Sequence, residues 1–211
     1  MKSLCSLGVL ALFISACSPA PNQTAQAAAP PAATPAPPPA QKSGPVTPPS
    51  TDAEKIASAK SAGPEAIASA ATVLDVSVDP PKALQKGTNG LVCYDRSGFA
   101  QQAPFSVQCT SIANLERVAQ NLKAEALGDK TKSEAMLKDL ESKGQRVKPE
   151  YGSMWHSVAG PDRERATRHH AMIAVPGATT QSTGLPDNPR QGGAWIMNAG
   201  TSKAHIMVPG Q

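Results

Sequence analysis

Methionine and histidine recur two positions apart at three places in the last third of the chain: Met154 with His156, His170 with Met172, and His205 with Met207. Residues two apart in a β-strand point to the same face, so each pair would present a thioether beside an imidazole. Thioethers select Cu(I) and imidazole also binds copper, so the pattern indicates a copper site if at least two pairs converge. The alternative, which we favour, is that the methionines fill the core and the histidines lie at strand ends or face solvent.

Two further cysteines, Cys93 and Cys109, also have side chains that could do chemistry. The other two cysteines, Cys5 and Cys17, belong to the N-terminal leader and to its cleavage site. In an exported protein an oxidising compartment would join them, and closing a loop of about 15 residues would contribute roughly 3 kcal/mol. A redox-active pair is the alternative, but the Cys-x-x-Cys spacing of redox catalysts is absent. We therefore predict a structural Cys93–Cys109 disulfide.

Another cysteine, Cys17, directly follows a segment laid out like a secretory signal, with a basic start, an apolar run over 4–14 and small residues. That run is about half of the ~20 residues that a membrane-spanning helix needs. The stretch Ile14-Ser15-Ala16-Cys17 resembles the lipobox of bacterial lipoproteins. The resemblance implies a signal peptide over 1–16, a lipidated Cys17 and, because Ser18 follows, sorting to the periplasmic face of the outer membrane. The alternative is an ordinary signal peptide with an incidental cysteine.

The sequence carries none of the catalytic spacings that we sought: Gly-x-Ser-x-Gly, a phosphate-binding loop, His-Glu-x-x-His or Ser-x-x-Lys. The paired carboxylates Asp139 with Glu141 and Asp162 with Glu164 lie in charged segments typical of a solvated surface. An enzyme whose site is assembled only in space is therefore the third interpretation of the chain, and we lean against it.

The charge balance gives little support to a polyanionic partner. Lys and Arg number 20 against 16 Asp and Glu, and leaving out Lys2 and Lys42 reduces the difference to two. A basic run at 163–170 could contact anionic lipid, glycan or cell-wall phosphate, or simply form a solvated loop. Nothing resembles a nucleic-acid module, and export argues against nucleic acid as a partner.

Composition divides the chain into three segments. The signal peptide at 1–16 is followed by the lipidated cysteine and a Pro/Ala-rich linker at 17–50, in which Lys42 is the only charged residue. Such a linker buries too little apolar surface to order itself, and it predicts a disordered tether that could extend on the order of 100 Å. Residues 51–211 are predicted to form a single domain.

Local patterns place helices and strands in that domain. Thr51 and Glu54 fit a capping box that begins a helix running to Ala62. Helices are expected at 65–71, 111–127 and 132–143, and strands at 72–78, 91–94, 105–109, 151–158, 171–175, 194–198 and 205–208. This order predicts an α+β fold with a small, mostly antiparallel sheet and helices packed on one face.

Three pieces of the domain are similar to a group of uncharacterised secreted bacterial proteins. They are IASAKSAGPEAIA at 56–68 with ATV at 71–73, GTNGLVC at 87–93, and AHIMVP at 204–209. The similarity extends from Ile56 to the end, and the chain departs from it between Cys93 and Trp155, where it is more charged and helical. The group brings no known activity, so the resemblance implies no catalytic or binding residue.

These observations predict a lipid-anchored protein of the bacterial cell envelope that acts by binding or structural contact. Its expected partners are the membrane, through the lipid, and an envelope protein or cell-wall component. No cofactor is expected. The runner-up is a periplasmic copper-binding module built on the Met/His pairs.

Overall fold

The computed structural model describes residues 47–166 and 168–209. The predicted signal peptide, Cys17 and the tether up to residue 46 lie outside these ranges. Within them, no helix combines the length and the apolar character needed to cross a membrane.

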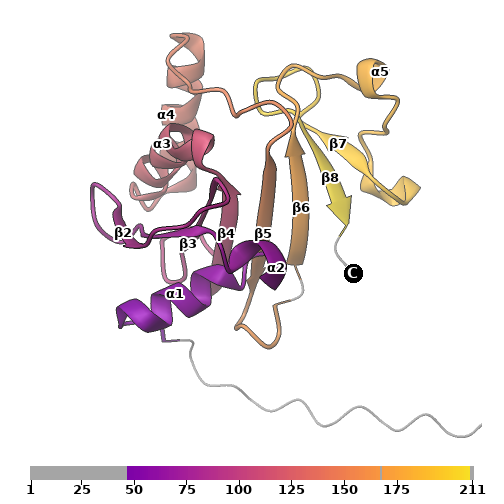
Figure 1. Cartoon of the computed structure of the whole chain (residues 1–211). Coiled ribbons are helices and arrows are strands. Elements are labelled where there is room, and N and C mark those ends of the chain that lie inside the picture. Colours follow the sequence, from indigo (N-terminus) through magenta and orange to yellow (C-terminus); the bar gives the residue numbers. More distant parts are fainter. Residues whose placement is uncertain (1–46, 167, 210–211) are drawn as a thin grey trace, which may run out of the picture. The chain divides into compact units, whose positions relative to one another are not determined.

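Eight strands form one sheet in the order β2, β1, β3, β4, β5, β6, β8, β7 (Figure 1). Their bounds are β1 Thr72–Asp75, β2 Lys82–Gln85, β3 Leu91–Asp95, β4 Phe105–Ser111, β5 Met154–Gly160, β6 Arg168–Ala174, β7 Trp195–Met197 and β8 His205–Pro209. Neighbouring strands are antiparallel, except that β1 runs parallel to β3. The predicted α+β class with a mostly antiparallel sheet is confirmed.

Helix α1 (Asp52–Lys60) covers one face of the first half of the sheet. The predicted capping box is present, with Thr51 accepting from the Glu54 amide and the Glu54 carboxylate accepting from the Thr51 amide. The backbone amides of Thr51 and Ser50, both of which donate to the Glu54 carboxylate, lower its pKa to about 2. Ala59 is fully buried in the cluster that α1 forms with β1, β3 and β4.

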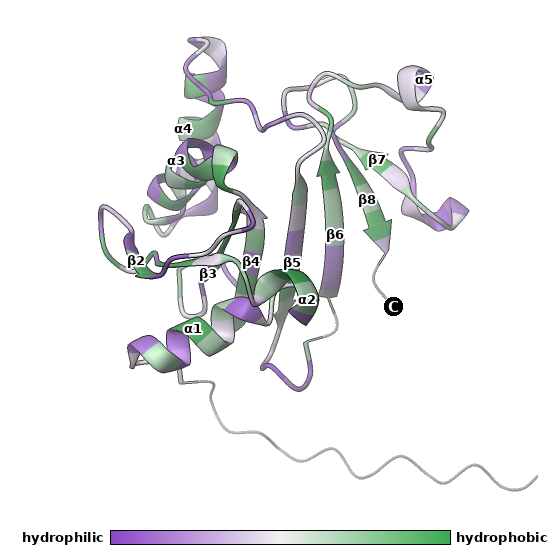
Figure 2. Cartoon of the chain, in the orientation of Figure 1, coloured by the Kyte–Doolittle hydropathy of each residue, from purple (hydrophilic) through white to green (hydrophobic). Residues whose placement is uncertain are grey.

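A helical hairpin of α3 (Leu115–Glu125) and α4 (Lys130–Ser142) lies on the opposite face. Val118 and Leu122 of α3 pack with Tyr94 of β3, whereas Cys93 packs under α1. Because consecutive strand residues point to opposite faces, these contacts place helices on both faces of the sheet. We had expected helices on one face. The cause is visible in β3, where Val92, Cys93 and Tyr94 are all buried, as in strands covered on both sides. Figure 2 shows hydrophobic and hydrophilic residues alternating along α3 and α4.

The remaining elements are short. They are α2 (Glu65–Ala68), α5 (Thr180–Thr183) and the 3₁₀ turns η1 (Ile112–Asn114) and η2 (Pro189–Gln191). Ile196 of β7, which is fully buried, centres a separate cluster with Val175 and Ala204. This cluster holds the loops after β6 and β7 against the end of the sheet.

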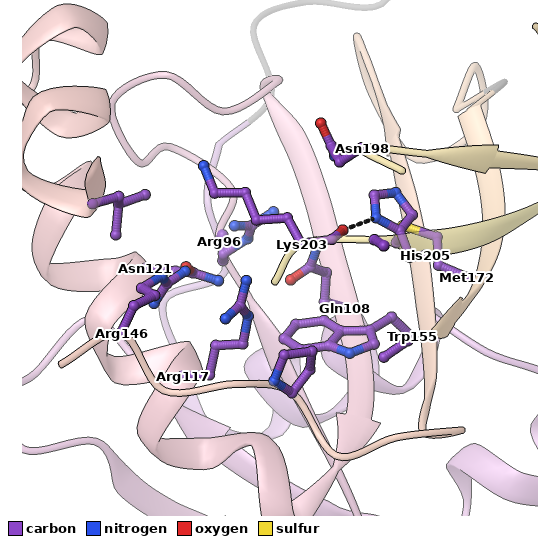
Figure 3. A pocket seen from close by; sticks show the side chains of 14 residues that line it. Arg96, Gln108, Arg117, Asn121, Arg146, Trp155, Met172, Asn198, Lys203 and His205 are labelled. Atoms are coloured by element: carbon purple, nitrogen blue, oxygen red, sulfur yellow. Dashed lines mark hydrogen bonds between the residues drawn. The ribbon is translucent and has the colours of Figure 1, made fainter. Parts of the chain in front are cut away.

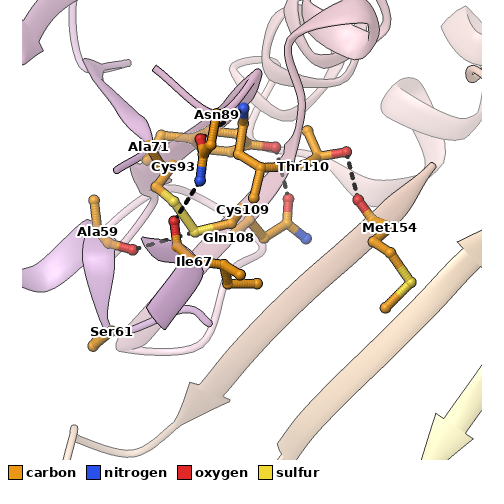
Figure 4. Close-up of a disulfide and its surroundings, with 12 residues drawn as sticks. Ala59, Ser61, Ile67, Ala71, Asn89, Cys93, Gln108, Cys109, Thr110 and Met154 are labelled. Carbon is orange, nitrogen blue, oxygen red and sulfur yellow. Dashed lines mark hydrogen bonds between the residues drawn. A yellow bond between two sulfur atoms is a disulfide. The ribbon is translucent and has the colours of Figure 1, made fainter. Parts of the chain in front are cut away.

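The predicted disulfide joins the neighbouring strands β3 and β4. Cys93 and Cys109 are directly opposite in the antiparallel register, with their Cα atoms 4.0 Å apart. Both are buried beneath α1, and the carbonyl oxygen of Ala59 lies 3.9 Å from Cys109 Sγ (Figure 4). The crosslink therefore lies in the hydrophobic cluster between α1 and the sheet.

Candidate anion-binding site

The structure brings together the methionines of two of the three Met/His pairs, while His170 lies opposite Pro209 and His205 opposite Ala174. Met172 of β6 lies directly opposite Met207 of β8. His170 and His205 are each two residues from these methionines and therefore share their face of the sheet. This face is the one that carries the α3–α4 hairpin further along the sheet.

The remaining pair, Met154 and His156, lies on the opposite face. The reason is the register: Trp155, between them, pairs with Met172. His156 faces Gly63 beside α1, and burial lowers the pKa of its imidazole. Across the described ranges, no group of three or more His, Cys, Asp or Glu side chains is placed to hold a metal ion.

A cavity of about 300 Å³ opens between the α3–α4 hairpin, the sheet and the β7–β8 loop (Figure 3). Four cationic side chains line it: Arg96, Arg117, Arg146 and Lys203. The other lining residues are Gln108, Asn121, Leu137, Pro149, Trp155, Met172, Ala174, Asn198, Ala204 and His205. No Asp, Glu, Ser, Thr or Cys belongs to this lining, so the cavity presents positive charge without a carboxylate.

Polar residues of α3 hold the segment that carries Arg146 and Pro149. Asn114, which is fully buried at the start of α3, accepts from the Glu150 amide at 2.8 Å. Six residues further on, within α3, Gln120 Oε1 accepts from the Val147 amide at 3.0 Å. These bonds fix the connection from α4 to β5 against α3 and so form one wall of the cavity.

One of the four cations has an acidic partner. Arg96 follows β3 and donates to Glu125 of α3 at 2.7 Å. Burial raises the pKa of Glu125, and the charge of Arg96 opposes that effect only in part. The pair ties the sheet to the hairpin, and it neutralises Arg96.

Arg117 and Arg146 are different. Each is only 7% exposed, and within the described ranges neither forms an ion pair. Arg117 donates to the carbonyl of Val147, and Arg146 donates to Gln120 at 2.7 Å and to Asn121. Their partners are therefore neutral, and Arg146 Nε is buried without a hydrogen-bond partner.

Burial disfavours the charge of both guanidinium groups. Burial, together with the charge of Arg146, lowers the pKa of Arg117 to about 10, while Glu141 raises it in part. Burial likewise lowers the pKa of Arg146, and Glu141 again opposes the effect. Both groups still carry a positive charge at neutral pH. The cavity therefore holds two buried charges that an anion would neutralise.

The sheet side of the cavity is less charged. Trp155 is half-buried there, and Gln108 accepts a 2.8 Å hydrogen bond from Tyr94. His205 lies at the edge, where its Nδ1 is 2.7 Å from the Lys203 carbonyl (Figure 3). Because a carbonyl only accepts, Nδ1 carries the hydrogen and Nε2 is the nitrogen that remains to contact a ligand.

A larger cavity, of about 520 Å³, lies between the segment after β1 and α3. Its walls include Val76, Val78, Phe99 and Leu122, and its charged groups are Asp79 and Lys123. It gathers no buried charge comparable with that of Arg117 and Arg146, so we place the candidate site in the smaller cavity.

Sequence reasoning had not singled out these arginines. Of the basic run at 163–170, Arg163 and Arg165 lie in the β5–β6 turn, where both are exposed and Arg165 pairs with Asp162 at 2.6 Å, and the last three residues belong to β6. A signal was present in α3: Asn114, Arg117 and Asn121 recur at helical spacing beside its apolar stripe. A polar stripe next to an apolar one indicates a helix that buries polar side chains.

Comparison of the chain with protein-family models, with curated proteins and with solved structures gave no significant match. The function is therefore argued from the geometry of the site.

Proposed function

We propose that this chain is a lipid-anchored protein of the bacterial envelope whose domain binds a small anionic ligand in the cavity beside α3. The leader and Cys17 support the location through their similarity to bacterial lipoproteins. The Cys93–Cys109 disulfide agrees with an oxidising compartment. The absence of Ser, Thr, Cys, Asp and Glu from the cavity lining favours binding over catalysis, since a nucleophile with a carboxylate base is not present there.

The observation that carries the proposal is the pair Arg117 and Arg146. A buried charge without an opposite charge costs several kcal/mol unless a partner neutralises it. Guanidinium groups bind carboxylate and phosphate oxygens through paired hydrogen bonds, and such charge-assisted bonds are about twice as strong as neutral ones. An anion in the cavity would meet both guanidinium groups at once.

Calorimetric titration of the full chain with inorganic phosphate and with citrate tests this function. We expect binding in the unmodified protein and a loss of at least about tenfold in affinity in Arg117→Met. The matched control is Arg190→Met, which removes an exposed arginine of η2 outside the cavity. Equal affinities in the two variants would refute the proposed site.

Copper binding is the second candidate, because Met172 lies opposite Met207 with His170 and His205 on the same face. The four cationic side chains of the adjoining cavity oppose it, since they repel a metal cation. Competition for Cu(I) against a chromophoric chelator distinguishes the two. Binding that is lost when His170 and His205 are replaced by alanine supports copper, and no uptake at micromolar copper rules it out.

A further inference from the structure

The two sides of the cavity differ in chemistry, and this difference says what kind of anion fits. We propose that the ligand is an acidic sugar, a single sugar ring that carries a carboxylate or a phosphate. The inference rests on the proposed anion-binding function and assigns its ligand class.

The side of the cavity that Arg117 and Arg146 line would bind the acidic group of the ligand. Arg117 lies on α3, and Arg146 lies on the connection from α4 to β5. Both line the cavity (Figure 3). A planar guanidinium matches the spacing of two carboxylate or phosphate oxygens, and two of them can hold one such group from both sides. A neutral sugar would leave both charges unpaired.

The side of the cavity that Trp155 lines would bind the ring of the ligand. The half-buried Trp155 and Pro149 both line the cavity, and Trp155 is held there by packing against the cluster that contains Tyr94 and Val118. Aromatic faces with a polar rim are typical of small-molecule sites, where the flat side chain provides contact area and nearby polar groups fix the orientation. The C–H face of a sugar ring can lie against such an indole.

The rim favours a sugar over an aromatic ring. Three carboxamides also line the cavity: Gln108, Asn121 and Asn198. A carboxamide both donates and accepts, so it can bond to hydroxyl groups, which also do both. The oxygens of Gln108 and Asn121 already accept from Tyr94 and Arg146, so their NH2 groups are the donors that hydroxyl groups of a sugar could use. The volume of about 300 Å³ is at the low end for ligand pockets and suits one ring.

Tryptophan fluorescence provides a direct measurement. The chain has two tryptophans, and Trp195 lies on β7 outside the cavity lining, so a Trp195→Phe background leaves Trp155 as the reporter. The probes are glucuronate and glucose 6-phosphate, compared with glucose, acetate, inorganic phosphate and phenyl phosphate. We expect both acidic sugars to change the Trp155 emission and to bind at least tenfold more tightly than the four comparison probes.

Two variants, measured by calorimetry in the full chain, separate the ring from the charge. Trp155→Leu should lose the advantage of the acidic sugars and keep the affinity for inorganic phosphate. Asn198→Gly should do the same more weakly, and glycine tolerates the positive φ of 53° at this exposed position, so folding is preserved.

The outcomes are distinct. If inorganic phosphate and acetate bind as tightly as the acidic sugars, or if phenyl phosphate binds most tightly, the sugar assignment is wrong while the anion site stands. If no anion binds at millimolar concentration, the proposed function fails together with it.

Discussion

Arg117 and Arg146 are separated by the whole of α4 in the chain, yet they line the same cavity, and the charge of Arg146 lowers the pKa of Arg117. Both depend on neutral partners, namely the carbonyl of Val147 and the side-chain amides of Gln120 and Asn121. Buried like charges are kept in proteins more readily where a function uses them than where stability alone is at stake.

Anion binding should be measurable as thermal stabilisation. A ligand at 100 times its Kd stabilises the folded state by about 2.7 kcal/mol. We expect phosphate to raise the Tm by several degrees more than chloride at equal ionic strength. The excess should vanish in Arg146→Met and persist in Arg190→Met. The same excess in both variants would mean that the effect is one of general salt and not of this cavity.

Removing the disulfide should destabilise the domain. Cys93 and Cys109 are 16 positions apart, and a loop of that size contributes about 3 kcal/mol in the chain-entropy account. Urea denaturation of a Cys93→Ala/Cys109→Ala variant should show a loss of this order. Adding reductant should lower the stability of the unmodified protein and leave the variant unchanged. Equal midpoints for the two proteins would contradict this role.

Asp75 should give the domain a characteristic loss of stability in acid. Burial favours its neutral form, but Lys55 at 2.6 Å and Ser77 outweigh that effect and lower its pKa to about 2 from 3.8. Because the folded pKa is the lower one, about 2 kcal/mol of stability is present above pH 4 and is lost as the pH falls toward 2. The free energy of unfolding, measured by denaturation at several pH values, should therefore depend less on pH in Asp75→Asn.

Glu54 titrates in the same range, since its pKa is also lowered to about 2. Glu54→Gln, measured in parallel, gives the share that belongs to the capping box. If Asp75→Asn keeps the full acid dependence, the Lys55 pair is not its source.

Gly87 should be intolerant of any side chain. A Cβ placed there would lie 2.2 Å from the Thr72 amide nitrogen and 2.3 Å from the Ala71 carbonyl carbon. Gly87→Ala must therefore move backbone at the start of β1 and should cost about 2 kcal/mol or more. Gly63→Ala is the matched control, because its Cβ would meet only His156, at an ordinary 3.6 Å. Similar unfolding free energies for the two variants would count against the close approach at Gly87.

The leader can be tested by mass spectrometry of the mature protein. The lipobox resemblance predicts a chain that begins at Cys17 and carries fatty acids on it. Cys17→Ser should leave a product without lipid. An unmodified Cys17 thiol, or an intact leader, would refute both the anchor and the location inferred from it.

Local patterns predicted much of the fold. The capping box at Thr51, the helix expected at 111–127 and observed as α3 at 115–125, and the Cys93–Cys109 crosslink follow from short-range rules that depend on few neighbours. Strand β2 (Lys82–Gln85) was missed because its sequence, KALQ, has no β-branched residue, and it exists through pairing with β1.

The site was harder to predict than the elements. Met172 and Met207 were singled out, but their opposition depends on the β6–β8 register, which no local pattern states. Arg96, Arg117 and Arg146 are scattered in the sequence and meet only through the packing of α3 on the sheet. Their burial could not be predicted from residue type, since arginine is ordinarily at the surface.

The cavity draws its walls from positions as distant as Arg96 and His205, and the latter belongs to the last strand. A nascent chain that has completed β1 to β5 and the helical hairpin would still have no closed site, because the β7–β8 loop supplies Asn198 and Lys203. Binding of the proposed ligand would therefore require the chain through β8, and a truncation before β7 should abolish recognition even where the hairpin survives.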